Sequence, residues 1–121
     1  MGGQPDSAIV YYNKTINAKA TSRNTYNFLG VAWFNKKDYN KASAVFSDGL
    51  KVYPDHTEMW LNYGNALAMS KNITEAIQAF NKVLELNPGN RQAFYSLALA
   101  YHDLGDDAQS DIYLAKYNGT K

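Results

Sequence analysis

The side chains that most often catalyse reactions or bind metals are few in this sequence and lie far apart. It contains two histidines, His56 and His102, and no cysteine. Neither histidine has an acidic residue or a second histidine at a clear ligand spacing, although Asp103 follows His102 directly. Without cysteine there is no thiol nucleophile, disulfide or thiolate metal site. We therefore interpret both histidines as surface or groove residues, and we predict no catalytic residue and no metal ligand.

The remaining patterns that resemble sites have simpler explanations. Gly105-Asp106-Asp107 fits a turn and a helix N-terminus, where acidic side chains are favoured, whereas calcium would need several more oxygen ligands. The sequence has no Gly-rich phosphate loop, nucleophile elbow or paired-carboxylate motif, so we expect no cofactor. With 13 asparagines, a few glycosylation triplets are unsurprising and we expect no glycan on them: Asn13-Lys14-Thr15, Asn72-Ile73-Thr74 and Asn118-Gly119-Thr120.

The composition predicts one folded domain spanning residues 1–121. Apolar residues make up 45% of the chain, charged residues 19%, and the net charge is +1. The lysines and arginines are scattered, so we expect no nucleic acid partner. No apolar run approaches the roughly 18 residues that span a bilayer, so we expect no direct membrane insertion of this segment. We expect a soluble domain, cytoplasmic or belonging to a membrane-anchored or exported parent protein.

The strongest pattern in the sequence is a period of 34 residues. The segment ELNPGNRQAFYSLALAY, which begins at Glu85, parallels KVYPDHTEMWLNYGNAL, which begins at Lys51. Large residues recur at this interval: Tyr26, Trp60 and Phe94; Leu29, Tyr63 and Leu97; Trp33, Leu67 and Tyr101; Phe46, Phe80 and Leu114. Small residues and a proline do the same: Gly30, Gly64 and Ala98; Ala42, Ala76 and Ser110; Pro54 and Pro88.

The spacing within each unit predicts two helices. In the middle unit, the recurring residues of 57–70 fall three and four apart, on one helical face. A polar break follows, and a second apolar face covers residues 73–86 until Pro88 ends it. Gly64 and Ala76 are small enough to let the two helix backbones approach closely, and Phe80 fills the space one turn along. One such pair has too little core to be stable alone, so the units must stack.

These recurring residues resemble the tetratricopeptide repeat, a 34-residue helix–turn–helix unit. The resemblance covers residues 23–121 and implies an all-α fold, a right-handed superhelical solenoid of antiparallel helix pairs. It implies a half repeat at residues 5–22 and repeats at 23–56, 57–90 and 91–121, of which the last matches least well. We expect about seven helices, near residues 5–17, 23–36, 39–52, 57–70, 73–86, 91–104 and 107–118.

The half repeat is predicted from Ala8 and Tyr12, which lie 34 residues before Ala42 and Phe46. We expect its helix to shield the apolar side of the next one. At the other end, exposed apolar residues would suggest continuation of the stack, self-association or truncation. The residues expected to be partly exposed there are Ile112, Tyr113 and Tyr117.

The family implies that the first helix of each unit lines a concave groove that binds a peptide or a partner helix. Asparagine amides can pair with a peptide backbone, and apolar side chains can accept an apolar anchor. For the two leucines in the set, packing between neighbouring first helices is an equally good interpretation. From the inward-facing residues that remain once the core positions are removed, we take these as groove candidates: Asn27, Val31, Phe34, Leu61, Asn62, Asn65, Tyr95, Leu99 and His102.

One function known in the family is not expected here. Co-chaperones with this repeat hold a C-terminal carboxylate with lysine, arginine and asparagine, because a desolvated anion must be paired. Of the corresponding positions in this chain, only Asn62 matches. Those positions are Asn27, Val31, Asn62, Gln92 and Ser96.

Three functions remain open from the sequence. The first is a non-catalytic scaffold that binds a protein or peptide partner in the groove, in which alanine at Asn62 and Tyr95 would weaken binding with little loss of stability. The second is an excised tail of a larger enzyme such as a glycosyltransferase, an interpretation suggested by the MGGQ start. The third is a self-assembling structural module, a homo-oligomer formed through the C-terminal helix.

Overall fold

The computed structural model describes residues 3–17 and 23–119, and within them every regular element is an α-helix. Every helix begins and ends within two residues of the positions expected from the sequence. Residues 18–22 of the expected half repeat and residues 120–121 of the last repeat lie outside the described part. The seven helices are α1 Gly3–Asn17, α2 Thr25–Asn35, α3 Tyr39–Val52, α4 Thr57–Met69, α5 Ile73–Leu86, α6 Arg91–Asp103 and α7 Asp107–Gly119.

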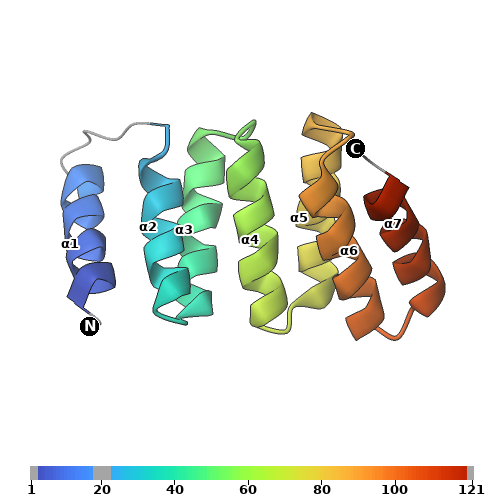
Figure 1. Cartoon of the computed structure of the whole chain (residues 1–121). Helices are drawn as coiled ribbons and strands as arrows, with labels where there is room; N and C mark the ends of the chain where they lie inside the picture. The colour runs from blue at the N-terminus through green and yellow to red at the C-terminus, as the bar shows by residue number, and fades with distance from the viewer. Residues whose placement is uncertain (1–2, 18–22, 120–121) are drawn as a thin grey trace.

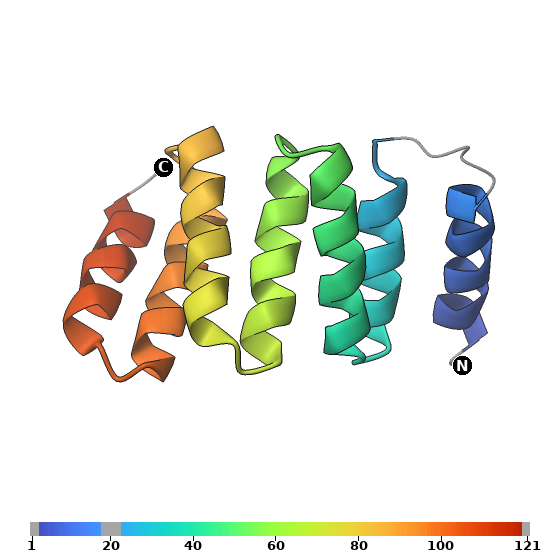
Figure 2. The ribbon, with the colours of Figure 1, turned by 180° about the vertical axis from the view of Figure 1, so that it is seen from behind.

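The helices form a right-handed superhelical solenoid of antiparallel pairs in two layers. The first helices α2 and α6 lie in front of their partners in Figure 1, and the second helices α3 and α5 lie in front in the reverse view of Figure 2. Each helix packs on its neighbours in the sequence, and α4 also contacts both α2 and α6. Within the described residues, α3 and α5 make no such contact. The first helices therefore lie closer together than the second helices do, which places them on the inner side of the curve.

The turn between the two helices of a unit has the same backbone conformation in all three units. Lys37, Lys71 and Gly105 lie 34 residues apart and have positive φ angles of 68°, 71° and 83°. In the first of these turns the amide of Lys37 donates to Phe34 O, and the amide of Asp38 donates to Trp33 O. This is the Schellman arrangement, which ends a helix with one left-handed residue and usually selects glycine there. Two of the three units use lysine instead.

The two helices of a unit nest where a glycine faces a phenylalanine. A Cβ atom built on Gly30 would lie 2.3 Å from the Phe46 ring, and one on Gly64 would lie 2.4 Å from the Phe80 ring. Both rings are fully buried. The prediction that small residues allow close helix approach is therefore confirmed at these two positions.

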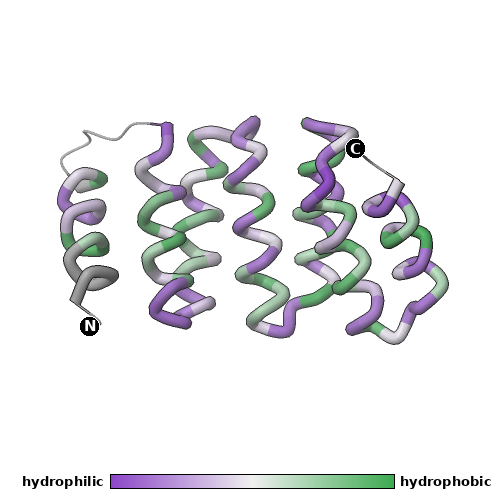
Figure 3. Tube along the Cα trace, in the orientation of Figure 1, coloured by the Kyte–Doolittle hydropathy of each residue, from purple (hydrophilic) through white to green (hydrophobic). Residues whose placement is uncertain are grey.

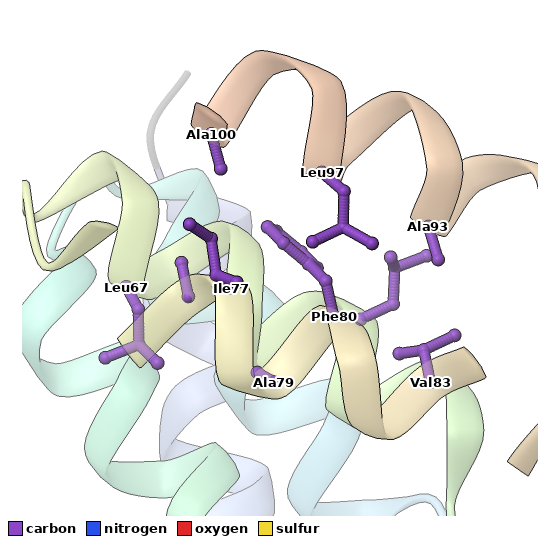
Figure 4. Close-up of a cluster of buried hydrophobic side chains, with 10 residues drawn as sticks. Leu67, Ile77, Ala79, Phe80, Val83, Ala93, Leu97 and Ala100 are labelled. Atoms are coloured by element: carbon purple, nitrogen blue, oxygen red, sulfur yellow. The ribbon is translucent and has the colours of Figure 1, made fainter. Parts of the chain in front are cut away.

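The core of the described residues consists of three clusters of buried side chains along the stack. Figure 4 shows the largest, where Phe80 of α5 points towards Leu97 of α6, with Ile77 and Val83 on either side. At the N-terminal end Ile9 of α1 packs with Leu29 of α2, so the half-repeat helix shields its neighbour as expected. Apolar residues are accordingly spread over every helix rather than gathered in one (Figure 3). Neighbouring clusters share partly buried aromatic residues, because Trp33 packs against the two N-terminal clusters and Trp60 and Tyr63 pack against the two C-terminal ones.

Candidate functional site

Two hydrogen bonds between side chains connect the first helices along the inner layer. Asn62 Nδ2 of α4 donates to Asn27 Oδ1 of α2 at 2.9 Å, and Ser96 Oγ of α6 donates to Asn65 Oδ1 of α4 at 3.5 Å. Each bond crosses from one unit to the next. The two bonds link the inner helices, and of the three asparagines only Asn62 and Asn65 are partly exposed.

The inner layer contains two pockets that meet at Asn65. The polar pocket has a volume of about 440 Å³ and is lined mainly by hydrogen-bonding side chains: Thr57, Glu58, Leu61, Asn62, Asn65, Asn90 and Gln92. The apolar pocket has a volume of about 300 Å³. Its lining residues are Phe34, Asn65, Ala68, Met69, Lys71, Phe80, Ser96, Leu99, Ala100 and Asp103. The two pockets adjoin at Asn65, and we call them together the groove, with a polar half and an apolar half.

Five of the nine predicted groove residues line this groove. Phe34, Asn65 and Leu99 line its apolar half, whereas Leu61 and Asn62 line its polar half with Asn65. Leu99 is 49% exposed, which favours groove exposure over packing for that leucine. Leu61 is 7% exposed and belongs to the buried core, so packing between helices is the better description there.

The other four predicted residues line neither pocket. Asn27 is only 2% exposed, and it holds Asn62 rather than presenting its own amide. Val31 packs against the core cluster of Phe46. Tyr95 lies at the α6–α7 end of the stack, with its ring 5.1 Å from that of Tyr117.

His102 also lies at the α6–α7 end. Its Nδ1 is 3.0 Å from Asp107 Oδ1, so it connects the end of α6 to the start of α7. The histidine therefore spans the turn between the two helices of the last unit and lies outside the groove.

Lys71 and Asp103 line the apolar pocket but were not predicted as groove residues. They provide its only charged side chains among the described lining residues. Lys71 reaches the pocket because it takes the left-handed position of the α4–α5 turn. A lysine gives no sequence signal for that conformation, which usually selects glycine.

His56 is a correction to the sequence interpretation, because it is neither a surface nor a groove residue. It is 6% exposed and precedes α4, where its Nδ1 accepts from the Met59 amide at 3.2 Å. Nε2 therefore carries the proton and donates to Asn24 Oδ1 at 2.8 Å. Burial, with a smaller contribution from the nearby Arg23 charge, lowers the pKa of His56 below its usual 6.5. The ring is a neutral helix cap that also connects the starts of α2 and α4.

The described residues contain neither a metal-binding cluster nor a membrane-spanning helix. Within residues 3–17 and 23–119, no group of three or more histidines and acidic residues is placed to hold a metal ion. No helix in these same ranges is long and apolar enough to cross a membrane. Because five of the nine predicted residues line it, the groove is the candidate functional site.

Comparison with known proteins gives several similar chains. The segment matching the peroxisomal targeting signal receptor of Saccharomyces cerevisiae is 35% identical over 86 residues, which is 71% of this chain and 14% of the receptor. Superkiller protein 3 of Schizosaccharomyces pombe is 33% identical over 78 residues, 64% of this chain and 6% of that protein. The crystal structure of MamA has a TM-score of 0.91 and 24% identity, covering 98% of this chain and 69% of MamA. This chain therefore spans only a small part of the two curated relatives.

The family is shown by sequence profiles that cover most of the described repeats. Residues 29–91 match one profile of the tetratricopeptide repeat, and residues 92–118 match a second. The first match alone covers more than half of the chain, and its bounds include the nested helix pair of Gly64 and Phe80. The chain belongs to the tetratricopeptide repeat family.

Proposed function

We propose that this chain is a non-catalytic protein-interaction scaffold that binds a peptide segment or a partner helix in the groove of its first helices. The observation that carries the proposal is the pair of pockets joined at Asn65, one polar and one apolar. A peptide needs both kinds of surface, because its backbone must be hydrogen-bonded while an apolar side chain is buried.

The polar half suits a peptide backbone. Asn62 has one amide hydrogen engaged by Asn27, which leaves its carbonyl oxygen and its second hydrogen for a ligand. Asn65 accepts a long bond from Ser96 and retains both of its amide hydrogens. Because the Asn62 side chain is held before binding, little ordering entropy is lost when a ligand arrives.

The apolar half suits one apolar side chain of the ligand. Leu99 and Met69 are each about half exposed, and the ring of Phe34 lines the same pocket. Covering such side chains contributes roughly 25 cal/mol for each Å² of apolar surface removed from water. A ligand with an apolar residue next to a hydrogen-bonded backbone segment would use both halves together.

The name of a relative supports a peptide ligand, and the residues at the clamp positions argue against a bare carboxylate tail. The yeast relative is named as a receptor for a targeting signal, and this chain matches a short part of it. The positions that clamp a carboxylate in co-chaperones carry no lysine or arginine here. As part of this proposal we keep the repeat boundaries 23–56, 57–90 and 91–121, with a half repeat at 5–22.

A peptide selection tests the proposal. Twelve-residue peptides displayed on phage would be selected against the protein, and the best peptide would be titrated by calorimetry. Met69→Ala with Leu99→Ala should weaken binding about tenfold or more, because two exposed anchors are lost. The matched control is Leu104→Ala with Ile112→Ala, which removes equally exposed side chains outside the groove. Equal affinity for both double variants would show that the groove is not the binding site.

The two other functions considered from the sequence are less well supported. In the self-assembly hypothesis the C-terminal helix offers Ile112, Tyr113 and Tyr117, but the Tyr113 ring stacks on Tyr101, and Tyr117 contacts Tyr95. Of the three, Ile112 is exposed, whereas Tyr113 and Tyr117 are half-buried. The enzyme-tail hypothesis depends on the native open reading frame and stays a prediction, as does a cytoplasmic location.

A further inference from the structure

The outer helices α3 and α5 carry charged side chains at three corresponding positions of the repeat, and the charge is opposite at each position. Along α3 the charges are positive, negative and positive, whereas along α5 they are negative, positive and negative. Spacings of seven and three residues place each set within a sector of about 80° on its helix, so each set forms one row along the surface. We call them the α3 row, which is Lys41, Asp48 and Lys51, and the α5 row, which is Glu75, Lys82 and Glu85.

Helices α1 and α7 lack this pattern. At the corresponding positions α1 carries one charged residue, Lys14, and α7 also carries one, Lys116. The two complementary rows are therefore confined to α3 and α5. These helices lie in the middle of the stack, and both face the viewer in Figure 2.

The two rows do not bind each other within one chain. Helices α3 and α5 make no contact, and among residues 3–17 and 23–119 no ion pair joins the rows. Five of the six side chains are exposed, and Lys82 is half-buried. The ion pairs that the row residues do make stay within one helix and its cap: Lys41 with Asp38 at 4.0 Å, Lys51 with Asp48 at 4.0 Å, and Lys82 with Glu85 at 3.3 Å.

The α5 row borders a hollow on the outer face. This pocket has a volume of about 320 Å³, and all three residues of the α5 row line it, together with Trp60, Tyr63 and Leu67 of α4. The α3 row is a ridge instead, because the residue between its charges on the same face is the small, exposed Ala44. The hollow has an excess of one negative charge and the ridge an excess of one positive charge, so the two are complementary in charge as well as in shape.

We propose that two copies of this chain associate back to back through their outer faces, with the α3 row of each copy on the α5 row of the other. A two-fold axis parallel to the helices brings both contacts together, because such an interface uses the same patch on both copies. Helices α3 and α5 run in the same direction, so all three positions meet in register. The pairs, each formed twice, are Lys41 with Glu75, Asp48 with Lys82, and Lys51 with Glu85.

Charge complementarity also selects the direction of the axis. An axis perpendicular to the helices would reverse one row, and Asp48 would then face Gln78 while Lys82 would face Ala44. The parallel axis leaves no charge of either row unpaired. Single exposed ion pairs contribute little, whereas several charges arranged as a network contribute more and determine the orientation of the partners.

An apolar contact lies at one end of each pair of rows. Val52 follows the α3 row directly and Leu86 follows the α5 row, at corresponding positions, and both side chains are exposed. The parallel axis brings Val52 of one copy to Leu86 of the other, which removes apolar surface from water. The groove lies on the inner layer, so it stays open in both copies of the dimer. If the proposed function holds, the dimer presents two peptide sites on opposite sides.

Sedimentation velocity of the full chain tests for the dimer. In about 50 mM salt we expect a monomer–dimer equilibrium, and in about 500 mM salt the Kd should rise about tenfold or more, because salt screens exposed charges. The groove variant Met69→Ala with Leu99→Ala should leave this Kd unchanged, which separates the dimer from peptide binding.

Charge reversal tests which surfaces meet. Lys41→Glu with Lys51→Glu makes the α3 row wholly negative, and Glu75→Lys with Glu85→Lys makes the α5 row wholly positive. Each double variant alone should be monomeric, because like charges then face each other. An equimolar mixture of the two should form a heterodimer, a recovery that a misfolded variant would not show. The matched control, Lys14→Glu with Lys116→Glu, changes the net charge equally at the same positions of α1 and α7 and should leave the Kd unchanged.

Engineered cysteines test the register, since the chain has no cysteine of its own. Ala44 and Gln78 occupy corresponding positions and face each other across the proposed interface. The variant with Ala44→Cys and Gln78→Cys should form a covalent dimer on oxidation, as seen in a non-reducing gel. A disulfide within one chain is excluded, because it needs Cα atoms within about 7 Å and α3 does not contact α5. Each single cysteine variant is a control and should stay monomeric.

Three results would overturn the proposal. The first is a chain that stays monomeric at low salt throughout the concentration series. The second is a mixture of the two charge-reversed variants that does not associate. The third is a dimer that both charge-reversed variants retain, which would place the contact on another surface, such as the C-terminal helix.

Discussion

Gly64 is the position where the nesting of two helices can be tested most directly. An added Cβ atom would lie 2.4 Å from Cε1 and 2.7 Å from Cδ1 of Phe80, whereas carbon atoms in favourable contact are about 3.5–4 Å apart. Phe80 is 1% exposed, so its ring cannot move into solvent to make room. We therefore predict that Gly64→Ala lowers the free energy of unfolding.

The size of the effect follows from two opposing terms. Helix propensity alone favours alanine over glycine by about 1 kcal/mol. Overpacking a closely packed core costs about 1–3 kcal/mol, and an overlap of this size belongs near the upper end. The expected net loss for Gly64→Ala is therefore about 2 kcal/mol.

The third unit suggests a compensating change, because it carries Ala98 and Leu114 at the two corresponding positions. Phe80→Leu alone should cost about 1–2 kcal/mol, since it removes buried atoms and leaves a space. In the double variant the alanine methyl group occupies part of that space. The combined loss should be smaller than the sum of the single losses, by about 2 kcal/mol.

Urea denaturation followed by circular dichroism measures all four members of this cycle. Gly89→Ala is the control, because a Cβ atom at that exposed turn would meet nothing within 4 Å. A Gly64→Ala variant as stable as the wild type would refute the predicted loss, because the gain in helix propensity would then fully offset the overlap. Strictly additive losses would refute it as well, since the two residues would not share one space.

Three further predictions follow from particular residues of the fold. Burial, and to a smaller extent the Arg23 charge, lowers the pKa of His56 in the folded protein. In acid the unfolded chain therefore binds more protons than the folded chain does. The associated stability is fully present above about pH 6.5 and is lost as the pH falls towards the folded-state pKa. His56→Asn, which caps without titrating, should reduce the difference in melting temperature between about pH 7.5 and about pH 5, and an unchanged difference would contradict this. Lys37→Gly should raise the free energy of unfolding by about 0.5–1 kcal/mol in urea titrations. The φ of 68° strains a lysine, and relief of this strain outweighs the greater chain entropy that glycine has in the unfolded state. Asn62→Ala should lower it by about 1–3 kcal/mol, because it removes the donor to the buried Asn27, and calorimetric melting without such a loss would show that the bond is not important to the fold.

The last of these predictions revises an expectation drawn from the sequence. The sequence predicts that alanine at both Asn62 and Tyr95 weakens binding with little loss of stability. The structure shows that Asn62 also satisfies Asn27, which is 2% exposed. Binding experiments at the groove are therefore better made with Met69 and Leu99, whose exposed side chains contribute less to the fold.

The sequence by itself determined the number of helices, their bounds and the order in which they pack. These depend on local rules, because apolar residues at spacings of three and four define a helical face, and glycine and proline end it. The 34-residue period then shows that each helix pair must be buried by its neighbours. Gly64 and Phe80 could be paired in this way because both recur in register with Gly30 and Phe46.

Only the tertiary structure decided which polar and apolar residues the groove presents. Asn27 and Leu61 occupy the same position in successive units, yet the first is held by Asn62 and the second packs into the core. His56 became a buried cap, and Lys71 reached the apolar pocket from a left-handed turn. Exposure at a helix surface depends on the side chains that the neighbouring unit brings against it, and a spacing pattern along one helix does not contain that information.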